Sequence, residues 1–376
     1  MGRKYLTKQS VLIIMLLCII LGKIIRYTVM YNTLVIPGIG WQLVDIVNSG
    51  TSQFGFTFSG TEMNDAASNA TQNACFIFSK LNILKLADTY YGYEILITVV
   101  FNILILILFN KLRSLYNLKE SMFIFASVVV LNIFDFCLAK EPVQMLYFIL
   151  MFYILLNNKM KDHTKLFFVF CAYLLSAVSY RNYYVLMALF LLYCYFALNL
   201  ILVKTEKVKS WHILLFIAGL FTFHLIFMSA VKNIMPSNYT ELIRVRFRGE
   251  SGASTIYTLF KSTQPLLFSL DYLLVILRML VPVELLVMGP KYAIFAIYQI
   301  VITIIVIKNL RNYNNISKTR RIALAIYLAF LLGSATFEPD FGSWVRHEAV
   351  VFPIYLILAG FKVEADENEI DLSGAL

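Results

Sequence analysis

The sequence predicts an all-α polytopic membrane protein with about 10–11 transmembrane helices. Hydrophobic residues make up 60% of the chain and charged residues 14%, whereas about a quarter of an ordinary soluble domain is charged. The mean hydropathy is +0.75. Apolar runs long enough to cross a hydrocarbon core of ~30 Å recur along most of the chain, which leaves no stretch for a sizeable soluble domain.

Ten apolar segments are expected to span the membrane. They are 10–30, 93–110, 121–139, 143–157, 166–180, 183–203, 211–231, 291–307, 321–337 and 348–361. The first follows a basic start and is not followed by a small-residue cleavage site, so we expect a retained helix and not a signal peptide.

Basic residues set the expected orientation. Seventeen of the 32 Lys and Arg residues lie in five short segments between or before the spans: 1–8, 111–120, 158–165, 204–209 and 308–321. The long segment 31–92 contains only Lys80 and Lys85. Because cytoplasmic loops retain Lys and Arg, we expect a cytoplasmic N-terminus and a long first outer loop at 31–92. The net charge of +10 then reflects cytoplasmic loops, and no nucleic-acid partner is expected.

The apolar region 265–289 is irregular, because it contains Asp271, Arg278, Pro282 and Glu284. Charged, broken backbone at membrane depth is tolerated only against protein or a wet cavity. We therefore expect a re-entrant or outer-leaflet segment, with eleven full spans as the alternative. The domain organisation is a single transmembrane domain over 1–362, with outer loops 31–92 and 232–290, followed by an acidic cytoplasmic tail at 363–376.

The five cysteines and four histidines form no cluster with metal-ligand spacing, and four of the cysteines lie in apolar runs. The sequence predicts neither a disulfide framework nor a metal site, and no cofactor is expected.

Three arginines alternate with apolar residues in the stretch ELIRVRFRGES. In an extended segment Arg244, Arg246 and Arg248 would line one surface on the expected outer side. Guanidinium groups match phosphate oxygens, which favours a bound anion. The alternative is that these side chains reach outward to lipid headgroups.

Two further outer helix ends carry candidate substrate contacts. Arg181 is flanked by three tyrosines in SYRNYY, which indicate either an interfacial aromatic belt or rings that stack on sugars. Lys140 and Glu141 lie in CLAKEPVQ between two apolar runs. They form either an ion pair in a helix hairpin or a substrate contact.

The stretch FEPDFGSWVRHE concentrates charge between two apolar runs. Glu338, Asp340, Arg346, His347 and Glu348 are expected to meet at the outer membrane surface. His347 is a candidate general acid or base because histidine titrates near neutral pH, and Glu338 and Asp340 are candidate catalytic carboxylates. The alternative is a tight loop in which Arg346 pairs with Glu338 or Asp340.

Asp135 is an ionisable residue inside the expected span 121–139. A lysine or arginine partner inside the bundle is expected for it.

In this layout, SYRNYY, AKEP, the outer arginines and EPDFGSWVRHE together resemble the Wzy and EpsG-like bacterial polysaccharide polymerases of O-antigen and capsule pathways. The resemblance implies a reaction at the outer face of the bacterial plasma membrane. Glycan would be transferred from undecaprenyl pyrophosphate to a lipid-linked repeat unit. It implies an undecaprenyl-pyrophosphate-linked oligosaccharide and membrane lipids as partners, and it allows a chain-length regulator protein.

The same resemblance implies that Arg244, Arg246 and Arg248, with Arg181 and Arg346, hold the pyrophosphate. His347, Glu338 or Asp340 would activate the acceptor hydroxyl. The long first outer loop departs from the family layout.

Three alternatives remain open. A multi-span polyprenyl-phosphate-sugar glycosyltransferase would use a carboxylate of the first outer loop, such as Asp45, Glu62 or Asp65. An O-antigen ligase would transfer the glycan to a different acceptor. A flippase for lipid-linked oligosaccharides is the reading from another class, and it would place charge at the bilayer midplane.

Overall fold

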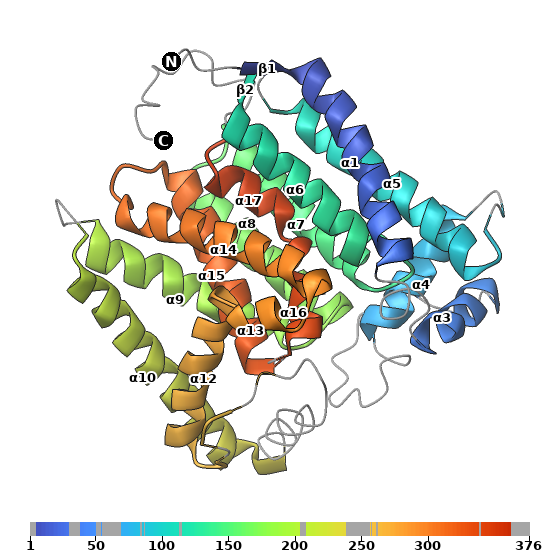
Figure 1. Cartoon of the computed structure of the whole chain (residues 1–376). Coiled ribbons are helices and arrows are strands. Elements are labelled where there is room, and N and C mark those ends of the chain that lie inside the picture. The colour runs from blue at the N-terminus through green and yellow to red at the C-terminus, as the bar shows by residue number, and fades with distance from the viewer. Residues whose placement is uncertain are drawn as a thin grey trace.

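The computed structural model describes residues 5–29, 38–49, 54, 69–82, 85, 87–112, 115–203, 208–237, 256, 258–260, 262–337 and 340–361. These residues form a helical bundle with one short two-stranded ribbon (Figure 1). Six described helices are long and apolar enough to cross a membrane: Lys8–Thr28, Tyr90–Asn110, Tyr184–Leu202, Ser210–Ile234, Tyr292–Arg311 and Lys318–Phe337. The prediction of an all-α polytopic membrane protein is confirmed.

The ribbon joins the starts of two helices. β1 (Tyr5–Thr7) pairs antiparallel with β2 (Leu115–Asn117), and each strand leads directly into a helix. α1 (Lys8–Thr28) follows β1 and α6 (Leu118–Phe134) follows β2, so both helices begin at the ribbon and run side by side in the same direction (Figure 1). We call this the ribbon end of the bundle.

α5 (Tyr90–Asn110) runs opposite to α1. The Lys8 ammonium at the start of α1 donates to the carbonyl of Asn110 at 2.9 Å. At the other end of α1, Arg26 contacts Glu94 in the first turns of α5. This second end, where Arg26, Glu141 and Arg346 lie, is called the charged end below.

α7 (Glu141–Leu156), α8 (Asp162–Ser179) and α9 (Tyr184–Leu202) follow α6 as consecutive helices. They surround α15 (Lys318–Phe337), in which every residue from 322 to 336 is buried. A helix that is apolar on all sides is stable only in such a central position. By contrast, α10 (Ser210–Ile234) lies at the edge of the bundle and packs on α9 (Figure 1).

The irregular segment 265–289 forms two helices, α12 (Pro265–Leu280) and α13 (Val283–Val287), ahead of α14 (Pro290–Arg311). The carbonyl of Leu280, at the end of α12, accepts a hydrogen bond from Thr303 in the middle of α14. α12 therefore stops partway along α14, and α13 packs back against α14. The expected break in this segment is confirmed.

The expected first outer loop contains two helices that the sequence does not predict, α3 (Gly38–Ser49) and α4 (Asn69–Leu81). They pack on each other near the start of α5 (Figure 1). Asn73 of α4 donates a buried hydrogen bond to the carbonyl of Ser179 at the end of α8. Both helices are shorter than a span, so apolar run length does not reveal them.

The expected last span, 348–361, is not one long helix, because it contains only the last two residues of one short helix and the whole of a second. α16 (Phe341–Ala349) and α17 (Phe352–Leu358) are separated by a turn. Pro353 lies in the first turn of α17, and proline cannot donate a backbone hydrogen bond to the helix before it. The segment therefore enters the bundle at the charged end and bends within it.

Candidate functional site

The first part of the charged end is an ion-pair cluster between α1 and α5. Arg26 Nε lies 2.6 Å from Glu94 Oε1, and Lys23 Nζ lies 3.0 Å from the same oxygen. Arg26 and Glu94 are each 1% exposed. A charge buried this deeply persists only when it is paired and hydrogen-bonded. The sequence signal for this cluster was the presence of three charges inside expected spans, but it did not show that they meet.

The cations of this cluster also cap α6. Arg26 donates to the carbonyl of Ile133 in the last turn of α6 at 2.8 Å, and Lys23 donates to the carbonyl of Phe136, two residues beyond the helix. The last carbonyls of a helix lack partners within the helix and carry its partial negative charge. Arg26 and Lys23 therefore tie the end of α6 to α1 and α5.

The second part joins α7 to α16. Arg346 Nε lies 3.7 Å from Glu141 Oε1. The Arg346 side chain is 39% exposed, whereas the Glu141 side chain is 2% exposed. Lys140 precedes Glu141 at the start of α7 and is partly exposed. Glu141 thus makes its ion pair with Arg346, and the expected loop pairing of Arg346 with Asp340 is not among the ion pairs of the described residues.

Gln144 connects three of the stretches that the sequence singled out. Its Oε1 lies 2.7 Å from Nδ1 of His347 and accepts a hydrogen bond from the Tyr180 hydroxyl at 3.3 Å. An amide oxygen can only accept, so Nδ1 of His347 carries a proton. AKEPVQ, SYRNYY and α16, which contains His347, therefore meet at one point. Gln144 itself was not anticipated, because an uncharged residue in an apolar run gives little signal.

Arg181 lies beside this point and is partly exposed. It donates to the Tyr183 hydroxyl at 3.2 Å, and its guanidinium lies over the Tyr183 ring at 5.7 Å from the centroid. The Tyr183 ring in turn stacks on Phe337 at the end of α15, with centroids 4.9 Å apart. The aromatic rings hold the guanidinium at the charged end.

Asp135 lies in the turn that follows α6 and is 0% exposed. Neither carboxylate oxygen has a hydrogen-bond partner among the described residues. Its electrostatic neighbours are Glu141, Arg346, Arg26 and Lys23. The expected interior cations are therefore near Asp135, but none forms an ion pair with it in the described part of the chain.

The remaining expected site residues fall into three groups. Asp340 Oδ1 accepts from the backbone N–H of Ser343 at 2.8 Å, so its carboxylate caps α16. Glu348 is fully buried and faces α14, α15 and α17, away from Glu141. Glu338 and Arg244, Arg246 and Arg248 lie outside the residues that the structure describes.

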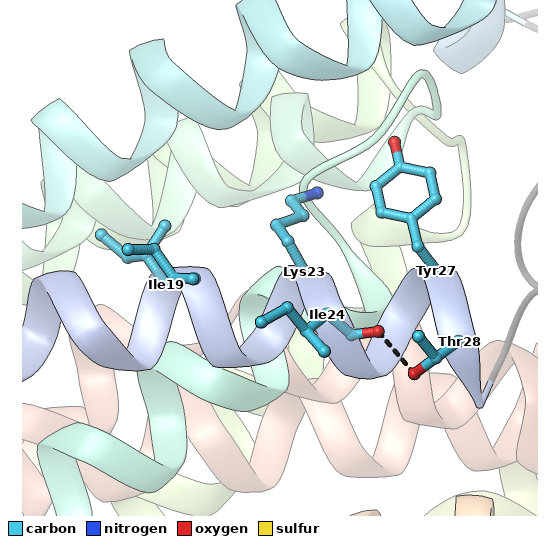
Figure 2. Close-up of a pocket in the computed structure, with 6 residues that line it drawn as sticks. Ile19, Lys23, Ile24, Tyr27 and Thr28 are labelled. Atoms are coloured by element: carbon cyan, nitrogen blue, oxygen red, sulfur yellow. Dashed lines mark hydrogen bonds between the residues drawn. The ribbon is translucent and has the colours of Figure 1, made fainter.

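A groove of about 420 Å³ lies on the exposed side of α1 next to the ion-pair cluster. It is lined by Ile19, Ile20, Lys23, Ile24, Tyr27 and Thr28. Figure 2 shows Lys23 and Tyr27 projecting from the same side of α1, while the Thr28 hydroxyl donates to the carbonyl of Ile24. The groove is apolar apart from these polar groups, so lipid chains can contact it.

Fold and site together define a multi-pass helical membrane protein with cations and carboxylates gathered at one end of the bundle. Comparisons with protein-family models, with curated proteins and with solved structures find no match. Within the described ranges, no three His, Cys, Asp or Glu side chains are grouped so that they could hold a metal ion.

Proposed function

We propose that this chain is a polysaccharide repeat-unit polymerase of the bacterial plasma membrane. It would transfer glycan from undecaprenyl pyrophosphate to a lipid-linked repeat unit at the outer face. The observation that carries the proposal is the meeting of Glu141, Gln144, Tyr180, Arg346 and His347 at the charged end. These residues come from three separate stretches, and each stretch belongs to the resemblance.

The proposed orientation places the ribbon end in the cytoplasm. Lys8, Lys119 and Lys159 are exposed or partly exposed at that end, in segments rich in basic residues. Cytoplasmic loops retain such residues. The charged end then faces the outside, where a lipid-linked saccharide would meet it.

Arg346 and Arg181 are the proposed ligands of the diphosphate. Arg346 is backed by the buried Glu141 carboxylate, yet part of its guanidinium side chain remains exposed. Departure of a diphosphate develops negative charge, which preorganised cations in a poorly hydrated site stabilise. Lys140 adds a third, partly exposed cation. Arg244, Arg246 and Arg248 keep the same proposed role.

His347 is the proposed base for the acceptor hydroxyl. Gln144 orients the ring through Nδ1, so Nε2 is the acceptor nitrogen of the neutral imidazole. His347 is only 2% exposed, and the proposal therefore requires α16 to shift when substrate binds. Asp340 acts in this proposal by capping α16, and Glu338 remains a candidate second carboxylate.

Replacement of Arg346 tests the proposal. Cells whose only copy carries Arg346→Ala should accumulate single repeat units and lose long glycan chains, while the protein still reaches the membrane. Arg346→Lys should retain part of the activity, because lysine supplies charge without the bidentate geometry. Chain length is read from glycan gels.

Lys318→Ala is the matched control, because Lys318 is an exposed cation at the ribbon end that pairs with Asp162 at 3.4 Å. Normal glycan length in the Arg346→Ala strain would contradict the proposal. Loss of all transfer, including the first coupling, would instead favour the alternative of a polyprenyl-phosphate-sugar glycosyltransferase.

A further inference from the structure

A second buried carboxylate lies in the interior of the bundle. Glu348 at the end of α16 is 0% exposed, and neither of its carboxylate oxygens has a hydrogen-bond partner among the described residues. The polar side chains that lie close enough to act on this carboxyl are Tyr355 of α17, Tyr327 of α15 and Gln299 of α14, but none of them meets hydrogen-bond geometry with it. All three are fully buried, so four segments converge on one enclosed charge.

The hydrogen-bond donors around Glu348 are largely committed elsewhere. The Tyr355 hydroxyl donates to the backbone carbonyl of Glu348 at 3.2 Å. Gln299 Nε2 donates to the Tyr327 hydroxyl at 3.4 Å, and Gln299 Oε1 has no partner among the described residues. Three acceptor oxygens, two of Glu348 and one of Gln299, therefore have no hydrogen bond. Only two donor hydrogens are left for them, the hydroxyl hydrogen of Tyr327 and the second amide hydrogen of Gln299.

The next polar layer supplies no further donor. The Tyr298 hydroxyl donates to Ser127 at 3.1 Å, and the Ser127 hydroxyl donates to the carbonyl of Phe123 at 2.8 Å. No described lysine or arginine is among the groups that act on the Glu348 carboxyl. The neighbouring cation Arg346 is directed to Glu141.

An ionised carboxylate at this depth strongly destabilises the fold unless a positive charge accompanies it. From the surplus of acceptors and the single negative charge we infer that the interior of the bundle contains a binding site for a small monovalent cation, either a proton or a sodium ion. The Glu348 carboxylate, Gln299 Oε1 and the Tyr327 hydroxyl are its ligands. All are hard oxygen donors, and one carboxylate neutralises one unit charge. The site uses none of the groups assigned to the proposed function, since its oxygens face α14, α15 and α17.

Thermal unfolding of the full chain in detergent tests the site. The midpoint is measured in sodium chloride and in choline chloride of equal ionic strength, each in mildly acidic and mildly alkaline buffer. A sodium site predicts a midpoint about 2–4 °C higher in sodium than in choline under alkaline conditions. The sodium effect shrinks in acid, because protons compete for the same carboxylate. A proton site predicts no sodium effect and a midpoint that falls as the pH rises.

Glu348→Gln removes the charge. It should abolish the dependence of the unfolding midpoint on sodium or on pH, whichever of the two the wild type shows. Asp45→Asn, which neutralises an exposed carboxylate of α3, is the matched control and should leave the dependence intact. Identical responses of the wild type and Glu348→Gln to sodium and pH would overturn the inference.

If Glu348→Gln does not fold, the Gln299→Met variant tests the site in its place. This variant keeps the carboxylate but removes one ligand oxygen, so it should reduce the sodium shift. For a proton site, infrared spectra of the wild type should show a protonated carboxylic acid whose band responds to Gln299→Met. A wild type without sodium dependence and without such a band would equally overturn the inference.

Discussion

At the scale of single residues, the protein keeps charge inside an apolar bundle by pairing it. The Glu94 carboxylate pairs with both Lys23 and Arg26, and Arg26 also donates a hydrogen bond to the Tyr90 hydroxyl at 3.2 Å. Lys318 and Asp162 form a pair of the same chemistry at the ribbon end, but its lysine side chain is 71% exposed. Burial separates the two cases, because water already stabilises the exposed ions.

Glu94→Gln should lower the free energy of unfolding by about 3–5 kcal/mol, since it leaves Arg26 buried without its counter-charge. Asp162→Asn breaks the exposed pair and should cost at most about 1 kcal/mol. Both changes in the free energy of unfolding are measured by denaturation of the purified protein. The double variant Arg26→Met with Glu94→Gln should recover part of the loss. An equal cost for Glu94→Gln and Asp162→Asn would contradict the pairing described here.

At the scale of helices, α1 and α6 approach closely where α1 carries a glycine. A Cβ atom on Gly22 would lie 2.8 Å from Asn132 Cβ and 3.0 Å from the backbone oxygen of Val129. Small residues permit such contacts between membrane helices. The close approach places Arg26, one turn further along α1, within reach of the end of α6.

Gly22→Ala should therefore destabilise the protein by about 1–3 kcal/mol, because the contact with Val129 is to backbone that cannot turn aside. Gly219→Ala is the matched control on α10. There the added Cβ meets the Tyr193 hydroxyl at 2.7 Å, at the tip of a side chain that can rotate. Thermal melting compares the two variants. Equal losses in both would argue against a tight α1–α6 contact.

At the scale of the whole molecule, the bundle has two chemically different ends. Exposed Lys159 lies between α7 and α8 at the ribbon end, and exposed Asp45 lies on α3 at the charged end. The proposed orientation places them on opposite sides of the membrane.

A membrane-impermeant maleimide should label Asp45→Cys in intact cells, and should label Lys159→Cys only after permeabilisation. The native background should be low, because four of the five cysteines are buried. Burial also raises the pKa of the Cys75 thiol to about 12, so it is not a thiolate at the pH of labelling. Labelling of both introduced cysteines from the same side would rule out the proposed orientation.

Long apolar helices could be predicted from the sequence because their signal is local. The expected spans 183–203 and 321–337 correspond to α9 (Tyr184–Leu202) and α15 (Lys318–Phe337). The short α3 and α4 could not be found in this way, and neither could the bend between α16 and α17. Within the site, Arg346, His347 and Glu141 stood out by charge, whereas Gln144 is uncharged and showed no signal.

Composition, apolar run length and the positions of Lys and Arg depend only on residues near one another in the chain. The sequence by itself therefore determined the class of protein, most of the long apolar helices and which segments carry charge. Tertiary structure alone decided that Arg346 meets Glu141, that Glu94 serves Lys23 and Arg26, and that Glu348 is enclosed among tyrosines. Each of these outcomes depends on the packing of helices far apart in sequence, and such packing leaves no local pattern.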